Sequence, residues 1–159
     1  MAIKPRRIKA NTTTDYLGSW QVMNESGVDI AKGKLVQVSG VNSSGAFLLV
    51  KLLDVGAAVS ALVDAPKFVA GMSIPNGGNG SIRENYIDTA AVTKTAAGTS
   101  SVGDSVYAAL SGSAGSWTTE DDKPGGSPIK VGIVVKVSSA QDVADGVVLL
   151  APQARVGAA

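Results

Sequence analysis

Short runs of alternating hydrophobic and polar residues, separated by turn residues, recur along most of this 159-residue chain. The clearest is Lys130–Val137, which predicts a strand whose odd-numbered residues, Val131 to Val137, share one face and whose even-numbered residues share the other. Ala46–Leu53 is apolar on both faces apart from Lys51. Such a run is typical of a strand that is covered on both sides, in a sandwich or at an interface.

The remaining strand candidates lie about ten residues apart, with turn residues between them. They are Tyr16–Met23, Lys34–Ser39, Lys67–Ile74, Ser81–Ile87, Ala90–Lys94, Ser105–Leu110, Trp117–Thr119 and Val147–Ala151. Val55–Val63 fits two interpretations, because its apolar residues follow helical spacing while Gly56, Pro66 and the valines favour a strand, which we adopt. The strongest turn signal is Pro75–Gly80, PNGGNG.

Strands at this spacing, with no helical segment between them, predict an all-β fold, a barrel or a sandwich of short antiparallel strands. We expect an extended basic arm over residues 1–15, a single β domain over 16–153 and a small-residue tail over 154–159. The chain is long enough to bury a core without disulfides or metals.

The arm carries Lys4, Arg6, Arg7 and Lys9 before the first acidic residue, and the rest of the chain holds ten basic against thirteen acidic residues. Such an arm could bind an acidic groove on a protein, bind nucleic acid, or remain in solvent without a partner. No aromatic residue lies among the four cations, so base stacking is missing and we expect no nucleic acid partner. We expect the arm to bind a protein partner, with Ile3 and Ile8 in apolar pockets and the backbone added to a sheet edge.

Composition excludes several kinds of chemistry. The chain has no histidine and no cysteine, so it cannot build a Ser-His-Asp triad, a Cys-His pair or an ordinary zinc site. Charged residues make up 17% of the chain, below the roughly 25% of typical soluble domains, which favours association with another surface. There is no apolar run of about 18 residues and no apolar signal segment, so we expect no membrane partner.

Each candidate site has a structural interpretation that we prefer. Glu120–Asp122 could bind a hard cation, and Gly77–Gly80 could cradle a phosphate, but neither has the spacing of a known loop of that kind. Asp104 is expected to bind local backbone amides rather than to act as a catalytic carboxylate. Glu84 and Asp88 could pair as acid and base, although nothing fixes their distance. We therefore expect no enzyme activity, no cofactor and no metal.

The two tryptophans, Trp20 and Trp117, have a candidate role of a different kind. Either indole could stack on a sugar or a base, but we expect both to be core or interface anchors.

The chain between about residues 57 and 151 resembles β-rich structural proteins of tailed bacteriophages, most closely the head decoration, or capsid cement, proteins. The resemblance lies in a series of strands and turn glycines: Ala61–Ala65, Phe68–Met72, Val102–Tyr107, Lys130–Val135 and Asp145–Leu150. It implies a β-barrel or β-tulip-like domain, usually a homotrimer, with an N-terminal arm that reaches across the shell.

The same resemblance implies a structural virion protein that binds the major capsid protein and stabilises the outer capsid surface after assembly in the host cytoplasm. Residues Ile3, Lys4, Arg6, Arg7, Ile8 and Lys9 would then form the capsid-binding arm. Short decoration proteins often lack a segment such as 16–53, so its role stays open. The alternatives are a tail or head-fibre module that binds a host receptor or glycan, and a carboxylate-based glycan hydrolase.

Overall fold

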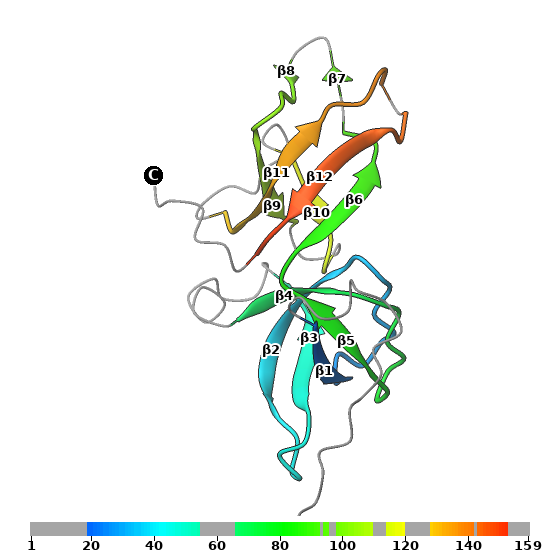
Figure 1. The fold of residues 1–159 in the computed structure, drawn as a ribbon, viewed down its shortest axis with the longest axis vertical. Coiled ribbons are helices and arrows are strands. Elements are labelled where there is room, and N and C mark those ends of the chain that lie inside the picture. The colour runs from blue at the N-terminus through cyan, green and yellow to red at the C-terminus, as the bar shows by residue number, and fades with distance from the viewer. Residues whose placement is uncertain are drawn as a thin grey trace, which may run out of the picture.

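The computed structural model of the chain describes residues 19–54, 66–92, 94–95, 98–109, 114–119, 128–141 and 143–152. Within these ranges the regular elements are strands, with no helix, which confirms the all-β prediction. The strands form a closed five-stranded barrel from the N-terminal part and a five-stranded sheet from the C-terminal part (Figure 1). No helix in the described part of the chain is long and apolar enough to cross a membrane.

The barrel has the strand order β1-β3-β2-β4-β5 and closes through the pairing of β1 with β5. Its strands are β1 (Ser19–Asn24), β2 (Leu35–Val41), β3 (Leu48–Leu52), β4 (Lys67–Ala70) and β5 (Asn79–Arg83). Four of the five pairings are antiparallel, as expected, but β1 runs parallel to β3. A parallel pair requires a crossover between its strands. Here the crossover is β2, which lies on the far side of β3.

The C-terminal sheet has the order β10-β9-β11-β12-β6 and all of its pairings are antiparallel. Its strands are β6 (Tyr86–Ala90), β9 (Ser105–Ala108), β10 (Trp117–Thr118), β11 (Lys130–Lys136) and β12 (Gly146–Leu150). The sheet is open, so β6 and β10 are its two edges. A small hairpin of β7 (Lys94–Thr95) and β8 (Gly98–Thr99) stands apart from it.

Two hydrophobic cores hold the fold, and the barrel contributes to both. The register pairs Val36 of β2 with Phe68 of β4, and these side chains fill the barrel. The adjacent pair, Leu35 and Val69, points out of the barrel into the core beneath the C-terminal sheet. Because successive strand residues point to opposite faces, β2 and β4 can contribute side chains to both cores.

The sequence predicts that Ala46–Leu53 is covered on both sides, but in β3 only Val50 is fully buried.

The face assignment along Lys130–Val137 was wrong in the middle of the segment. Ile133 is only partly buried, Val134 is buried and Val135 is 47% exposed, the reverse of a strict alternation that starts from buried Val131, whereas Val137 packs against the core again, as expected. The register of β11 shifts against β9 between Lys130 and Gly132, and against β12 between Val134 and Lys136. A bulge inserts one residue, which moves every later side chain to the other face. The hydrophobic pattern alone could not show where these shifts fall.

Two turn predictions are confirmed. Pro75–Gly78 is a turn within the connection from β4 to β5, with the Gly78 amide donating to the Pro75 carbonyl at 2.8 Å and Gly77 at φ 69°. A positive φ at the third turn residue requires glycine or asparagine. The carboxylate of Asp104 accepts a hydrogen bond from the backbone amide of Ser101 at 2.5 Å, so it fixes the turn that leads into β9.

Some predictions fall outside the described residues. These are the arm with Ile3, Lys4, Arg6, Arg7, Ile8 and Lys9, the segment Val55–Val63, the acidic run Glu120–Asp122 and the tail over 154–159. The boundaries of the expected arm, domain and tail stay predictions.

The connection between β11 and β12 leads to a prediction about pH. Asp145 accepts hydrogen bonds from the Ser139 amide at 2.8 Å and from Lys136 Nζ at 3.0 Å, and these two contacts lower the pKa of its carboxyl from the ordinary 3.8. A carboxyl whose pKa is lowered in the folded state stabilises the protein at pH values above its unfolded-state pKa, and this stabilisation is lost as the pH falls through its folded-state pKa. We expect Asp145→Asn to have a lower melting temperature than the wild type at pH 6, and the difference between the two melting temperatures to be smaller at pH 3. A difference that is the same at both pH values would contradict this origin of the stability.

Candidate functional site

The outer face of the C-terminal sheet carries an exposed row of apolar side chains. The register aligns Ile87 of β6 with Leu149 of β12, and Leu149 with Ile133 of β11, so the three share one face. Ile87 is 69% exposed, and Leu149 and Ile133 are partly exposed. Val135, two residues after Ile133 in β11 and 47% exposed, extends this apolar area. We call Ile87, Leu149, Ile133 and Val135 the outer row.

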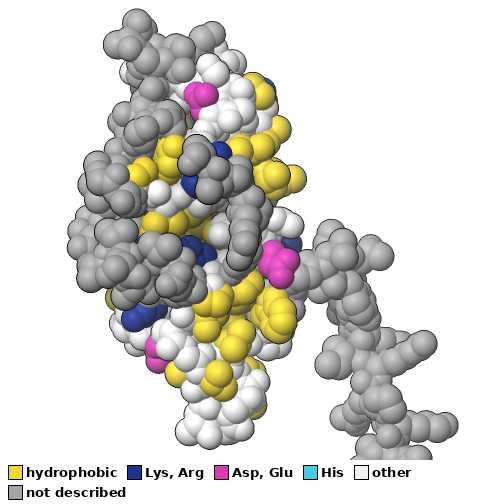
Figure 2. Space-filling model, turned by 90° about the vertical axis from the view of Figure 1, so that its left-hand side faces the viewer, with side chains coloured by type: hydrophobic (Ala, Val, Ile, Leu, Met, Phe, Trp, Pro, Cys, Tyr) yellow, Lys and Arg dark blue, Asp and Glu magenta, His cyan; other side chains and the backbone are white. Residues whose placement is uncertain are grey.

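The outer row ends at β6, an edge strand of the sheet. Edge strands in monomeric proteins are commonly guarded by charges, proline or a bulge, and the charge that β6 carries, Asp88, is on its inner face. Within the described part of the chain, β6 pairs only with β12, and its register with that strand runs without a shift over five residues. The outward residues of β6 are the uncharged Ile87 and Thr89, both exposed. Figure 2 shows hydrophobic side chains reaching the surface along the right-hand edge of the upper half of the molecule.

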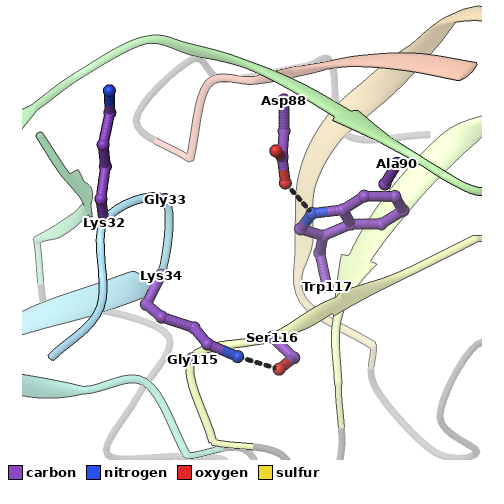
Figure 3. A pocket seen from close by; sticks show the side chains of 8 residues that line it. All are labelled: Lys32, Gly33, Lys34, Asp88, Ala90, Gly115, Ser116 and Trp117. Atoms are coloured by element: carbon purple, nitrogen blue, oxygen red, sulfur yellow. Dashed lines mark hydrogen bonds between the residues drawn. The ribbon is translucent and has the colours of Figure 1, made fainter. Parts of the chain in front are cut away.

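A pocket of about 290 Å³ lies where the barrel meets the two edges of the C-terminal sheet. The barrel side contributes a turn before β2, and the sheet side contributes residues of β6 and of the strand β10 with the loop before it (Figure 3). Its lining residues are Lys32, Gly33, Lys34, Asp88, Ala90, Gly115, Ser116 and Trp117. We call this the junction pocket.

Backbone hydrogen bonds fix the walls of the junction pocket. The Leu35 amide donates to the Gly115 carbonyl at 2.8 Å, and the Gly115 amide donates to the Leu53 carbonyl at 2.7 Å. Gly115 has φ 73°, and a Cβ there would lie 2.6 Å from Leu52 Cδ2, so this close approach requires glycine. The loop before β10 is therefore attached directly to the barrel, and the pocket spans the two units.

Two side-chain hydrogen bonds cross the pocket. Trp117 Nε1 of β10 donates to Asp88 Oδ2 of β6 at 2.9 Å, which links the two open edges of the sheet. Lys34 Nζ donates to Ser116 Oγ at 2.7 Å, which links the barrel to the sheet. In Figure 3, Asp88 and Trp117 point toward each other on one side, while Lys32 and Lys34 come from the turn on the other.

The structure brings together few of the residues singled out from the sequence. Asp88 binds Trp117, while Glu84 is exposed between β5 and β6, so the suggested acid–base pair has no geometric support. Trp117 packs against the core beneath the C-terminal sheet, as expected for an anchor. Trp20 is 50% exposed on β1 and belongs to neither core.

Sequence reasoning missed the outer row and the pocket lysines. The alternation in Tyr86–Ala90 was a usable signal for Ile87, because that run is too short and too polar for a strand buried on both faces. Nothing in the local sequence marks Lys32 or Lys34. Among the described residues no group of three or more acidic side chains could hold a metal ion. The described residues offer an apolar surface at the outer row and polar side chains in the junction pocket.

No protein-family model, no curated protein and no solved structure matches this chain.

Proposed function

We propose that this protein is a structural virion component that decorates and stabilises the outer surface of a phage capsid by binding major capsid protein subunits. The observation that carries the proposal is the outer row on the C-terminal sheet. Contiguous exposed apolar surface next to an open sheet edge is typical of a protein that works in contact with another protein. The strands that form this surface also lie within the segment that resembles the decoration proteins.

The packing of the barrel against the C-terminal sheet suits a protein that stabilises a capsid surface. Both cores are closed by side chains from distant segments, and Leu35, Leu53 and Val69 of the N-terminal part complete the core beneath the C-terminal sheet. A body of this kind transmits force between the surfaces that it contacts, because packed interiors have low compressibility. We propose a homotrimer in which the outer row contacts either a neighbouring copy or the capsid subunit.

The arm supplies the second contact in this proposal. Ordering an extended segment costs on the order of 1 kcal/mol per residue, while exposed ion pairs return about 0.2–1 kcal/mol each. The four basic residues therefore cannot offset the ordering of the whole arm by charge alone. Backbone pairing with a sheet edge on the capsid subunit, with Ile3 and Ile8 buried, is needed to offset the entropy.

This arrangement predicts the result of deleting residues 2–14. The deletion is expected to leave the melting transition of the isolated protein unchanged, because the described strands begin at Ser19. It is expected to weaken binding to shells prepared without the protein and to lower the temperature at which decorated shells break. Replacing only Lys4, Arg6, Arg7 and Lys9 with glutamine should give a smaller loss that shrinks at high salt. Unchanged shell affinity and unchanged shell stability after the deletion would refute the role of the arm.

A further inference from the structure

The face of the C-terminal sheet that carries the outer row is uncharged at its centre. The register places Ile87, Leu149 and Ile133 in one line with Ser105 of β9, and it places Thr89 beside Val147 in the next line. All six of these side chains are exposed or partly exposed, and none of them carries a charge. The central part of this face therefore offers apolar and hydroxyl groups across four neighbouring strands.

The charged side chains of the same face lie at its margins. Lys130 and Lys136 are the two end residues of β11. The ammonium of Lys136 is bound to the Asp145 carboxylate at 3.0 Å, so its charge is already balanced within the chain. An apolar centre with charges at the margin is the usual composition of a contact surface between proteins.

This distribution of charge suits contact with an identical surface. Copies that meet around a symmetry axis bring side chains close to their own counterparts. A charged residue at the centre would then lie near the same charge, which destabilises such a contact. Recognition of a different protein, in contrast, commonly uses complementary charges. The whole chain has a formal net charge of +1, so long-range repulsion between copies is small.

We propose that the outer row packs against the outer row of a second copy of this chain, around the symmetry axis of the homotrimer. This inference rests on the proposed function, in which copies of the chain associate, and it leaves the capsid contact to other surfaces, the arm among them. Ile87 is 69% exposed and Val135 is 47% exposed in the single chain. Removing these side chains from water on association drives the contact.

The absence of cysteine from the chain allows a direct test, because a single introduced thiol reports on one position. Ile87→Cys places the thiol in the outer row, and Val41→Cys, at a position 55% exposed on the barrel, is the matched control. A short bis-maleimide reagent joins two copies only where their thiols are close. We expect at least tenfold more cross-linked pairs for Ile87→Cys than for Val41→Cys, in the free protein or, where copies meet only on the capsid, on decorated shells.

A second position tests whether the apolar face itself drives the contact. Thr89→Cys is exposed on the same face of β6 and is expected to cross-link in the same way. Adding Ile87→Lys to Thr89→Cys places a charge at the centre of the face, so the yield of cross-linked pairs should fall at least tenfold. Adding Val41→Lys instead should leave the yield unchanged. Equal yields in these two double variants would overturn the inference.

A photoreactive group attached to the thiol of Ile87→Cys identifies what covers the outer row on decorated shells. We expect capture of a second copy of this chain, at residues of its C-terminal sheet. Capture of the capsid subunit, without an excess of cross-linked pairs, would overturn the inference and leave the proposed function in place. Cross-linked copies of a protein that binds no shell would support the self-contact and refute the role on the capsid, so the two failures are distinguishable.

Discussion

Gly132→Ala is expected to lower the free energy of unfolding by about 3 kcal/mol or more, at the upper end of the range for overpacking. Gly132 is buried in β11, opposite Leu150 of β12. A Cβ at this position would overlap the Leu149 carbonyl oxygen and lie 3.1 Å from both the Leu149 carbonyl carbon and Leu150 Cα. These are backbone atoms of the neighbouring strand, so no side-chain rotation can relieve the clash. The melting temperature should fall by roughly 6–12 °C.

Gly40→Ala is the matched control, because Gly40 also lies in a strand, β2, next to a register shift. The nearest atom to a Cβ there is Leu49 Cδ1 at 3.9 Å, an ordinary van der Waals distance. Alanine restricts the unfolded chain more than glycine does, so this variant should be unchanged or more stable by up to about 1 kcal/mol. Equal melting temperatures for the two variants would mean that β11 and β12 do not approach as described.

The positions of strands and turns could largely be predicted because they depend on local sequence. Alternation and turn residues indicated β2, β9 and β12 to within a few residues, and the turn at Pro75–Gly78 followed from its own composition. The bulges in β11 could not be predicted, because the extra residue is set by how two neighbouring strands pair. The parallel pairing of β1 with β3 is likewise a property of barrel closure, not of either strand alone.

The candidate sites could not be predicted from the sequence, because they too depend on contacts between distant segments of the chain. Lys34 and Ser116 are 82 positions apart, and Asp88 and Trp117 are 29 positions apart. Each residue has an ordinary local setting, and a pocket forms only when the loop before β10 is attached to the barrel through Gly115. Trp117 was expected to be an anchor because a large amphipathic side chain commonly is one, but its partner could not be foreseen.

The edge strand β6 contributes residues to both the outer row and the junction pocket. Ile87 and Asp88 are consecutive residues of β6, so their side chains point to opposite faces of the sheet. Ile87 contributes to the exposed apolar face, and Asp88 to the pocket. Substitutions at the two positions therefore change different features of the molecule, the outer row and the junction pocket, even though the residues are neighbours in the chain.

If the outer row is a contact surface of the decorated capsid, Ile87→Lys should reduce binding to shells at least about 30-fold. A central apolar contact is commonly worth about 2 kcal/mol or more, and the variant also places an unpaired ammonium in the interface. Because Ile87 is 69% exposed in the isolated chain, its melting temperature should stay close to that of the wild type. Titration of labelled protein onto undecorated shells measures the affinity, and sedimentation of the free protein reports any loss of self-association.

Val41→Lys is the control for Ile87→Lys, since Val41 is 55% exposed at the end of β2 on the barrel, away from the outer row. Both variants add one positive charge and remove one exposed β-branched side chain, so a general effect of charge on a capsid surface would appear in both. A specific contact at the C-terminal sheet affects only Ile87→Lys. Wild-type binding by Ile87→Lys, or an equal loss in both variants, would show that the outer row is not the contact surface. Such a result would leave the arm as the remaining candidate for attachment, because its deletion tests a different part of the chain.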